Sequence, residues 1–553
     1  MRCFFILAAC AVGTLTLSSA AGSEPQKNQN RDDWHAEGKT GAVCVGGKDA
    51  RDASLAMLKS GGNAADAAAV ATLIINITDG SVCFGGEAPI MFYDGKTGAV
   101  EVLCGQGAAP RLATREYFAS IGGIPGKGIK LAAVPGTLDA VLTLVERRGT
   151  KTFAEIVAPV LKILDGNKKG YHTNLAKTFR RMIEAEKASP NDRKRGIRLA
   201  ADYFYRGPIA REIDAWMKKN NGLIRYTDMA THVTRIEEPL SVDYRGFTVL
   251  KCDFWSQGPC FLQMARILEG FDLKSMGYNE PDTVHVMIET MKLCFADRDY
   301  WYGDPLFATN VPAKQLLTPE YAALRRSLID MKKSSKEHIP GDPTKNLARM
   351  EKPVVFPKGK VGEILDTSAV LTVDQWGNAV AVTPSGKPSQ TMDETGIVFG
   401  SRLHLFNIDK NSNNCIEPGK RPRTTISPGM VLKNGKAVLL LSTEGGDYQE
   451  QALIQYFVGV LDFGLHPKEF ASKPRFGTDQ YVNSFGQVPP KLGSVLLDAA
   501  IGQKVIDSMK ARGGVVTTKA APWSSSVMIY LDSNTGMIEA AGEVRRGRYA
   551  GAY

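Results

Sequence analysis

The pattern of apolar residues changes abruptly near residue 367, and this change limits the possible folds more than any other feature of the sequence. Between about residues 132 and 336 helical segments dominate, and in the stretch TVHVMIETMKLCFADRDYWYG apolar side chains recur at three-to-four spacing, which is typical of a helix. The segment that follows, DTSAVLTVDQWGNAVAVTPS, contains two β-rich runs around the turn Asp374–Gly377, which predicts a hairpin. The chain is therefore predicted to contain both helices and strands, with an abrupt change from helix-rich to strand-rich sequence.

Further elements are predicted on both sides of this change. A helix that begins near Asp49 stops at Gly61–Gly62, and Asn63 is placed to cap a second, alanine-rich helix. The run 333–360 is rich in Lys, Pro, Gly and Ser and predicts an exposed, mobile connection. Strand-like runs are predicted at 241–251, 429–442 and 525–542.

Residues 1–21 have the composition of a secretory signal peptide. The positive start Met1–Arg2 is followed by the apolar run CFFILAACAVGTLTL and by the small residues SSAAG. A membrane anchor is the alternative interpretation, but the apolar run is short for crossing a bilayer. Residues 22–35 are polar and lack apolar periodicity, which predicts a flexible leader. We therefore expect a secreted or periplasmic protein with no stable membrane span.

Charge and cysteine content exclude several classes of protein. The formal net charge is +10, but the basic residues are dispersed and form no stripe with interleaved aromatic residues, so no nucleic-acid partner is predicted. Two of the nine cysteines, Cys3 and Cys10, lie in the signal peptide, and the others form no CxxC pair. This spacing indicates neither a disulfide framework nor a zinc site.

Several common catalytic motifs are absent from this sequence or incomplete in it. There is no HExxH, and the histidines show no metal-ligand spacing, so no metal or other cofactor is predicted. GGIPGKGIK has Gly128 where a phosphate-binding loop needs Ser or Thr. FWSQG has Phe254 where a nucleophile elbow needs its first glycine. A Ser-His-Asp hydrolase is therefore weakly supported.

A series of segments, each weak alone, carries a specific resemblance when taken in order. They are SGGNAADAAAVA, GSVCFGGEAPIMFYDGKTG, AAPRLATRE, AAVPGTLDAV, YRGFTVL, ADRDYWYGDP, DTSAVLTVDQWGNAVAVT, GKRPRTTISP, STEGGDYQE and the terminal AGAY. In this order and spacing the chain resembles the γ-glutamyltranspeptidase family over nearly its whole length after the leader. The resemblance implies an α+β fold, the four-layer αββα arrangement of N-terminal nucleophile hydrolases. It also implies a precursor that cleaves itself between Asp366 and Thr367.

Cleavage there would produce a large subunit, 36–366, and a small catalytic subunit, 367–553, which stay associated. Without the resemblance, Asp366-Thr367-Ser368 would be read as an ordinary strand start. A threonine hydroxyl is a weak nucleophile that needs an adjacent base. Cleavage exposes an α-amino group on the same residue, with a pKa of about 7.7–8 that suits a base near neutral pH. One residue then supplies nucleophile and base, so no histidine is required.

Further catalytic residues are implied by the resemblance. Ser385 stands at the position of the family's second threonine, which assists the nucleophile, and keeps the hydroxyl. Gly445 and Gly446 match the diglycine whose backbone N–H groups form the oxyanion hole, although two glycines alone are also typical of a simple turn. Each well-placed donor is worth roughly 3–4 kcal/mol in the transition state.

The implied substrate pocket departs from the family pattern. In the family an arginine holds the substrate α-carboxylate, an asparagine orients the glutamyl group, a glutamine and an aspartate contact the α-amino group, and two serines lie near the carboxylate. Here Gln106 replaces the arginine and Lys387 replaces the asparagine. Arg402 and Leu405 replace the glutamine and the aspartate, and Thr424 and Thr425 replace the two serines.

The loss of the aspartate is the most important of these departures, because a buried ammonium needs a carboxylate partner and a leucine provides none. Lys387, Arg402 and Arg423 offer cationic contacts to substrate carboxylates; in the alternative interpretation they are solvated or bridge to Glu444 and Asp447. The segment 407–419 is shorter than in many family members, which predicts a more open pocket suited to a bulky amide.

Three functions are consistent with these residues. The first is a secreted amidohydrolase or acyltransferase of small-molecule or peptide γ-glutamyl amides, such as glutathione. The second keeps the mechanism but takes a carboxylated acyl group without the α-amino group, as acylases and amidases do. The third is a secreted binding protein on this fold whose precursor never cleaves.

Overall fold

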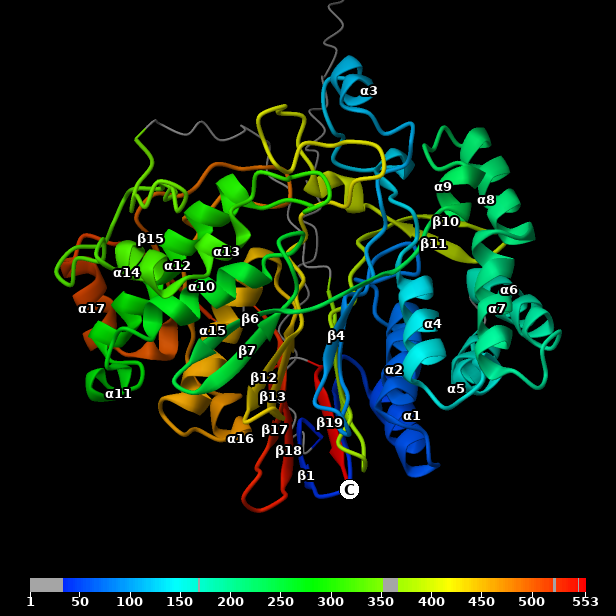
Figure 1. Cartoon of the computed structure of the whole chain (residues 1–553), viewed down its shortest axis with the longest axis horizontal. Helices are drawn as coiled ribbons and strands as arrows, with labels where there is room; N and C mark the ends of the chain where they lie inside the picture. The colour runs from blue at the N-terminus through cyan, green and yellow to red at the C-terminus, as the bar shows by residue number, and fades with distance from the viewer. Residues whose placement is uncertain (1–32, 168–169, 352–366, 521–523, 546) are drawn as a thin grey trace, which may run out of the picture.

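Two seven-stranded antiparallel sheets lie face to face at the centre of the molecule, and helices cover both outer faces (Figure 1). The computed structural model describes residues 33–167, 170–351, 367–520, 524–545 and 547–553. The predicted signal peptide and most of the predicted leader lie outside these residues, and the first strand begins at His35. This four-layer arrangement confirms the predicted αββα fold.

Both sheets combine strands from before and after residue 367. Sheet 1 has the order β1 (His35–Gly38), β18 (Ile538–Gly542), β17 (Ser526–Leu531), β13 (Lys436–Thr443), β12 (Gly429–Lys433), β7 (Phe247–Lys251) and β6 (Leu240–Tyr244). Sheet 2 has the order β19 (Tyr549–Ala552), β2 (Ala42–Val45), β8 (Val370–Val373), β9 (Ala379–Val382), β3 (Ile90–Tyr93), β4 (Val100–Cys104) and β5 (Arg235–Glu237). The layer between them is apolar and includes Leu371, Leu440 and Ile529.

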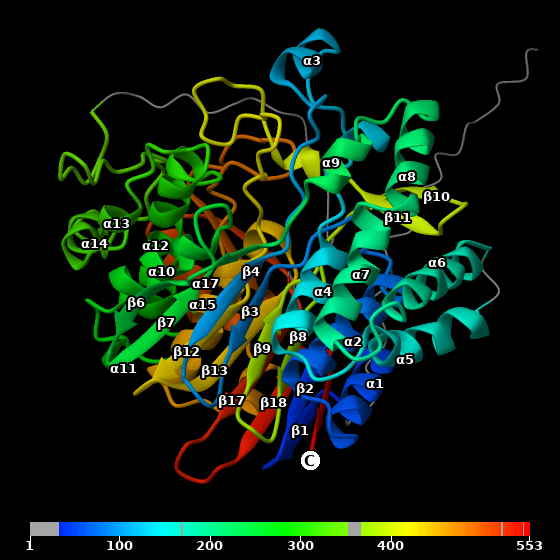
Figure 2. The same ribbon diagram turned by 45° about the vertical axis from the view of Figure 1, so that its right-hand side comes forward.

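Helices from before residue 367 cover sheet 2 (Figure 2). They are α1 (Lys48–Lys59), α2 (Ala64–Thr78), α4 (Thr137–Arg148), α5 (Phe153–Gly166), α6 (Gly170–Glu186), α7 (Arg193–Tyr205), α8 (Pro208–Lys219) and α9 (Tyr226–Ala230), with α3 (Arg115–Ser120) further out. As predicted, Asn63 caps α2: its side chain accepts from the Asp66 N–H, and Asp66 accepts from the Asn63 N–H. Helix α2 is buried on nearly all sides, and its alanines permit this close packing.

Helices from both parts of the chain cover sheet 1. They are α10 (Gly258–Leu268), α11 (Leu273–Met276), α12 (Pro281–Trp301), α13 (Ala313–Leu316), α14 (Pro319–Arg326), α15 (Gln449–Leu461), α16 (Pro467–Phe470) and α17 (Gln503–Ala511). Two small sheets complete the fold: β10 (Pro388–Met392) with β11 (Ile397–Gly400), and β14 (Phe476–Gly477) with β15 (Ser494–Asp498) and β16 (Val515–Lys519). Within the described residues, no helix is both long and apolar enough to cross a membrane.

The predicted hairpin around Asp374–Gly377 is confirmed as β8 and β9, and the strand-like runs are confirmed as β6–β7, β12–β13 and β17–β18. The described part of the predicted exposed connection, 333–351, forms no named helix or strand, and most of its residues are exposed or half-buried. Ser334 is an exception: it is buried, and its hydroxyl lies 2.8 Å from Nζ of Lys292 on α12. A partner on a distant helix anchors this loop, and loop composition alone does not reveal it.

Candidate active site

Thr367 lies three residues before β8 of sheet 2, and only 1% of its surface is exposed. It pairs with Ser385 in an isolated antiparallel bridge, and the Thr367 Oγ1 and Ser385 Oγ atoms are 3.2 Å apart. Ser385 follows β9, the antiparallel hairpin partner of β8. The two hydroxyls meet because β8 begins where β9 ends, at the open end of the hairpin. The fold thus brings together two hydroxyls predicted to act together. Asp366 lies outside the described residues.

The diglycine follows β13 in sheet 1 and leads into α15. Gly445 has φ 123° and Gly446 has φ 57°, backbone conformations that L side chains rarely adopt. A Cβ atom on Gly446 would stand 2.9 Å from the Phe485 ring, so glycine is required there. The Gly446 carbonyl accepts a hydrogen bond from Gln257 Nε2 at 3.1 Å, which fixes the orientation of this peptide group.

The ends of the two sheets are joined near these residues. Oγ of Ser442, at the end of β13, lies 2.8 Å from Oγ1 of Thr383, directly after β9, and donates to the Val382 carbonyl at 3.0 Å. The strand that precedes the diglycine therefore meets the strand that precedes Ser385. This contact holds the two predicted parts of the catalytic machinery on the same side of the molecule.

A buried ion pair lies against the hydroxyl of Ser385. Arg402, which is 1% exposed, donates to Ser385 Oγ at 3.2 Å and pairs with Glu87, which is fully buried. Thr424 Oγ1 donates to Glu87 at 2.7 Å and also accepts from Arg402 at 3.3 Å. The guanidinium therefore lies between a carboxylate and the two hydroxyls.

Gln106 belongs to the same cluster. Its side chain is fully buried, and Nε2 donates to Glu87 at 3.2 Å and to the Pro422 carbonyl at 2.8 Å. Sequence analysis missed Glu87, although a single acid within the glycine-rich, apolar run GGEAPIMF was a usable signal. Burying a carboxylate requires a partner, and Arg402 provides it.

Comparison with known proteins agrees with this geometry. The family model described as gamma-glutamyltranspeptidase matches residues 50–173 and 162–553. The chain belongs to the gamma-glutamyltranspeptidase family. It is 26% identical to a glutathione hydrolase proenzyme of Bacillus subtilis (97% of each chain covered). It is 27% identical to the acylase ACY 1 proenzyme of a Pseudomonas species, covering 87% of this chain and 90% of that protein.

The fold has a match among solved structures. The structure of cephalosporin acylase from Bacillus halodurans superposes with a TM-score of 0.80 at 24% identity, covering 96% of this chain and 99% of that one. The recognition of the family from ordered segments is confirmed by the family model. The predicted four-layer fold is confirmed by this superposition. Like its proenzyme relatives, this gamma-glutamyltranspeptidase-type chain is an enzyme with glutathione hydrolase and acylase homologues.

The cationic residues of the predicted pocket have internal partners that differ from those considered in the sequence. Arg402 pairs with Glu87, while Glu444 accepts from Arg548 at 2.6 Å and Asp447 pairs with Arg298. Arg402 is buried and pairs with a carboxylate that neither interpretation of the sequence considered. Glu87 lies 315 residues away in the sequence, so local patterns do not reveal this pair.

Arg423 contacts a different cluster, which includes Ser484 and Asp299. Its Nη2 donates to Ser484 Oγ at 2.9 Å, and Nη1 lies 3.5 Å from Asp299 Oδ1. It lines a cavity of about 20 Å³ together with Asn414, whose side-chain oxygen accepts from the Arg423 backbone. Burial lowers the pKa of Arg423 to about 10, with Arg298 acting in the same direction.

Lys387 and Thr425 complete the predicted pocket residues. Lys387 is half-buried with φ 47°, and its backbone carbonyl accepts from Ser401 at 3.1 Å. Burial, Arg402 and Lys387 together lower the pKa of His404 well below its usual value, so this ring is neutral. Thr425 is buried, and its hydroxyl has no hydrogen-bond partner within the described part of the chain.

Proposed function

We propose that the precursor is cleaved between Asp366 and Thr367 and that Thr367 then transfers acyl groups from amides through an ester intermediate. The observation that carries this proposal is the buried pair of hydroxyls, Thr367 Oγ1 and Ser385 Oγ, 3.2 Å apart at the end of the β8–β9 hairpin. After cleavage the α-amino group of Thr367 lies on the same residue as the hydroxyl and serves as its base.

In this mechanism Thr367 Oγ1 attacks the amide carbonyl carbon while its proton passes to the α-amino group. The N–H groups of Gly445 and Gly446 stabilise the oxyanion. The C–N bond then breaks, and the proton moves from the amino group to the departing amine. Water, or an acceptor amine, attacks the ester and regenerates the threonine. Because the Arg402 guanidinium donates to Ser385, it favours Ser385 as the donor to Thr367.

Both sheets depend on strands from before and after residue 367, which supports the proposal that the two subunits, 36–366 and 367–553, stay associated after cleavage. Separating them would expose the apolar layer between the sheets. We also propose export by residues 1–21, which amino-terminal sequencing of the large subunit from the periplasm or the medium tests.

For the acyl group, we propose a carboxylated chain that lacks an α-ammonium. Where the family pattern places a glutamine and an aspartate around the substrate amine, this chain has a donor-only guanidinium, Arg402, and a fully buried Leu405. An ammonium there would meet a like charge and an apolar side chain, at a desolvation cost with no compensating partner. Relatives named for glutathione hydrolysis and for acylase activity match this chain about equally, so pocket chemistry decides between them.

Two experiments test the proposal. On a denaturing gel, the purified protein should give two bands, the smaller beginning at Thr367; Thr367→Ala should give one band and no turnover, because the nucleophile is removed. Thr97→Ala, on the exposed β3–β4 turn, is the matched control and should mature normally. Normal maturation of Thr367→Ala would show that the nucleophile lies elsewhere, and an uncleaved wild type would favour the binding-protein alternative.

The matured enzyme is then assayed with glutaryl-p-nitroanilide and γ-glutamyl-p-nitroanilide. We expect the glutaryl substrate to have the higher kcat/KM by about tenfold or more, equivalent to about 1.4 kcal/mol of transition-state binding. A preference for the γ-glutamyl substrate would contradict the proposed acyl class and leave the nucleophile assignment intact.

A further inference from the structure

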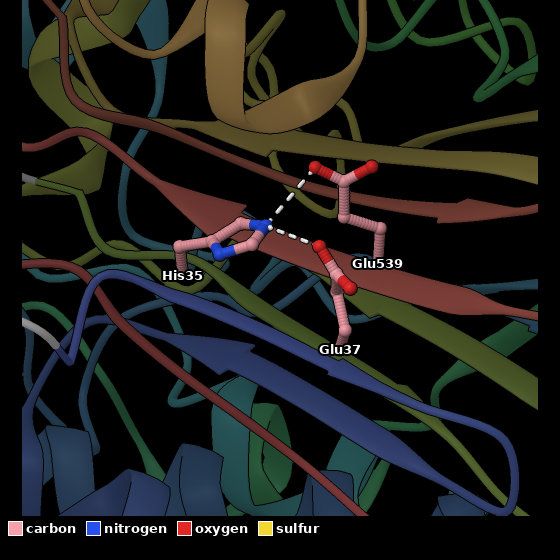
Figure 3. A group of neighbouring side chains, drawn as sticks. All are labelled: His35, Glu37 and Glu539. Carbon is pink, nitrogen blue, oxygen red and sulfur yellow. Dashed lines mark hydrogen bonds and ion pairs between the residues drawn. The ribbon is translucent and has the colours of Figure 1, made fainter.

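Three side chains converge at the β1 edge of sheet 1 (Figure 3). His35 and Glu37 lie on β1, and Glu539 lies on the neighbouring β18. His35 Nε2 is 3.0 Å from a Glu539 carboxylate oxygen and 3.6 Å from one of Glu37. The donor atoms of the three residues all lie within 4.8 Å of one another. Among the described residues, this is the group of His, Cys, Asp and Glu side chains with spacing suited to a metal ion.

The register of the two strands makes this arrangement costly without a cation. Glu37 is paired directly opposite Glu539, and like charges directly opposite each other destabilise an antiparallel pair. Glu539 is held by partners on two sides: the Lys468 backbone N–H lies 3.0 Å from one carboxylate oxygen, and His466 Nδ1 lies 3.0 Å from the other. With neutral imidazoles the cluster carries two negative charges, which a divalent cation neutralises.

We propose that His35, Glu37 and Glu539 bind a zinc-class divalent transition metal. Tetrahedral zinc bonds of about 2.0–2.2 Å to nitrogen and oxygen place neighbouring donors roughly 3.3–3.6 Å apart. The two His35 distances, 3.0 and 3.6 Å, bracket this spacing closely. A set of imidazole and carboxylate donors suits zinc, copper or nickel better than the all-oxygen preference of magnesium or calcium. His466 orients the Glu539 carboxylate from outside the ligand set.

The positions of the ligands suggest what the ion does. His35 and Glu37 precede residue 367, whereas Glu539 and His466 follow it. The ion therefore fastens the four-residue edge strand β1 to sheet 1 and, in the cleaved enzyme, links the two subunits. The link between subunits rests on the cleavage proposed above; the metal site itself does not.

Zinc titration of the tag-free, chelator-treated protein tests the site, with isothermal calorimetry as the readout. We expect one Zn²⁺ per chain, loss of that site in His35→Ala and Glu539→Gln, and an affinity about 10- to 100-fold weaker in His466→Ala. Glu184→Gln, on the exposed face of α6, is the matched control and should bind like the wild type. Equal binding in the wild type and the ligand variants, or no binding in the wild type, would overturn the proposal.

Two additional measurements keep the test independent of folding and of processing. Anomalous diffraction at the zinc edge from wild-type crystals should place a peak between His35 and Glu539; a peak elsewhere would refute the assignment even if the variants fail to fold. The titration is repeated with Thr367→Ala. Binding by this variant is expected because the site is formed by the uncleaved chain, so a failure of the proposed cleavage would be visible separately.

Discussion

The triple variant Gln106→Arg/Arg402→Gln/Leu405→Asp should shift the acyl specificity towards γ-glutamyl amides. It moves the arginine that pairs with Glu87 from position 402 to position 106. Gln106 Nε2 already lies 3.2 Å from Glu87, so an arginine there takes over as the partner of this carboxylate. The glutamine at 402 removes the like charge, and the aspartate at 405 supplies a carboxylate for a substrate ammonium.

The magnitude follows from the charges in the cluster. In the wild type Glu87 and Arg402 neutralise each other, whereas the triple variant carries one unpaired carboxylate that a substrate ammonium neutralises. A hydrogen bond between charged groups contributes about 1.5–3 kcal/mol. The ratio of kcat/KM for γ-glutamyl-p-nitroanilide to that for glutaryl-p-nitroanilide should therefore rise by about 10- to 150-fold.

The ratio is measured on matured enzyme, with the two bands confirmed on a gel, so that impaired processing does not enter it. Arg402→Gln alone is the control: it leaves Glu87 buried without its cation, which costs about 3–5 kcal/mol, and should lower maturation and both activities. An unchanged ratio in a triple variant that matures would refute the assignment of Arg402 and Leu405 to the amine subsite.

Three further results are expected. Ser385→Ala should slow both processing and turnover while keeping the fold, because it removes the hydroxyl 3.2 Å from the nucleophile; unchanged rates on gels and in assays would contradict its role. Gly446→Ala should lower kcat about 100-fold or more, since it strains a backbone with φ 57° and meets the Phe485 ring; near-wild-type turnover would separate this glycine from the oxyanion hole. Burial lowers the pKa of His232 to about 4, so between pH 4 and 6.5 the folded state binds fewer protons than the unfolded state. The free energy of unfolding therefore falls as pH falls from about 6.5 to 4, by about 3 kcal/mol in total. His232→Phe keeps a ring against Tyr205 and should flatten the fall in denaturation midpoint over this range; an unaltered pH profile would assign it to other groups.

Local patterns were sufficient for much of the fold. The Asn63 cap, the hairpin around Asp374–Gly377 and the long helix α12 depend on residues within a few positions of one another, so spacing and side-chain type encode them. The order of short segments was enough to recognise the family and to name Thr367, Ser385 and the diglycine as candidates. These predictions needed no knowledge of which distant segments meet.

The partners of buried charges were decided only by the tertiary structure. Arg402 and Glu87 are 315 residues apart. They meet because Gly85 pairs with Phe399 in an isolated bridge, which places the segment before β3 beside the segment after β11. The order of strands in sheet 2 brings Gln106 to Glu87, and the β1–β18 pairing places Glu37 opposite Glu539. A sequence specifies which charges must be buried or exposed through local composition, but the partner of each charge depends on how the whole chain is threaded through the two sheets.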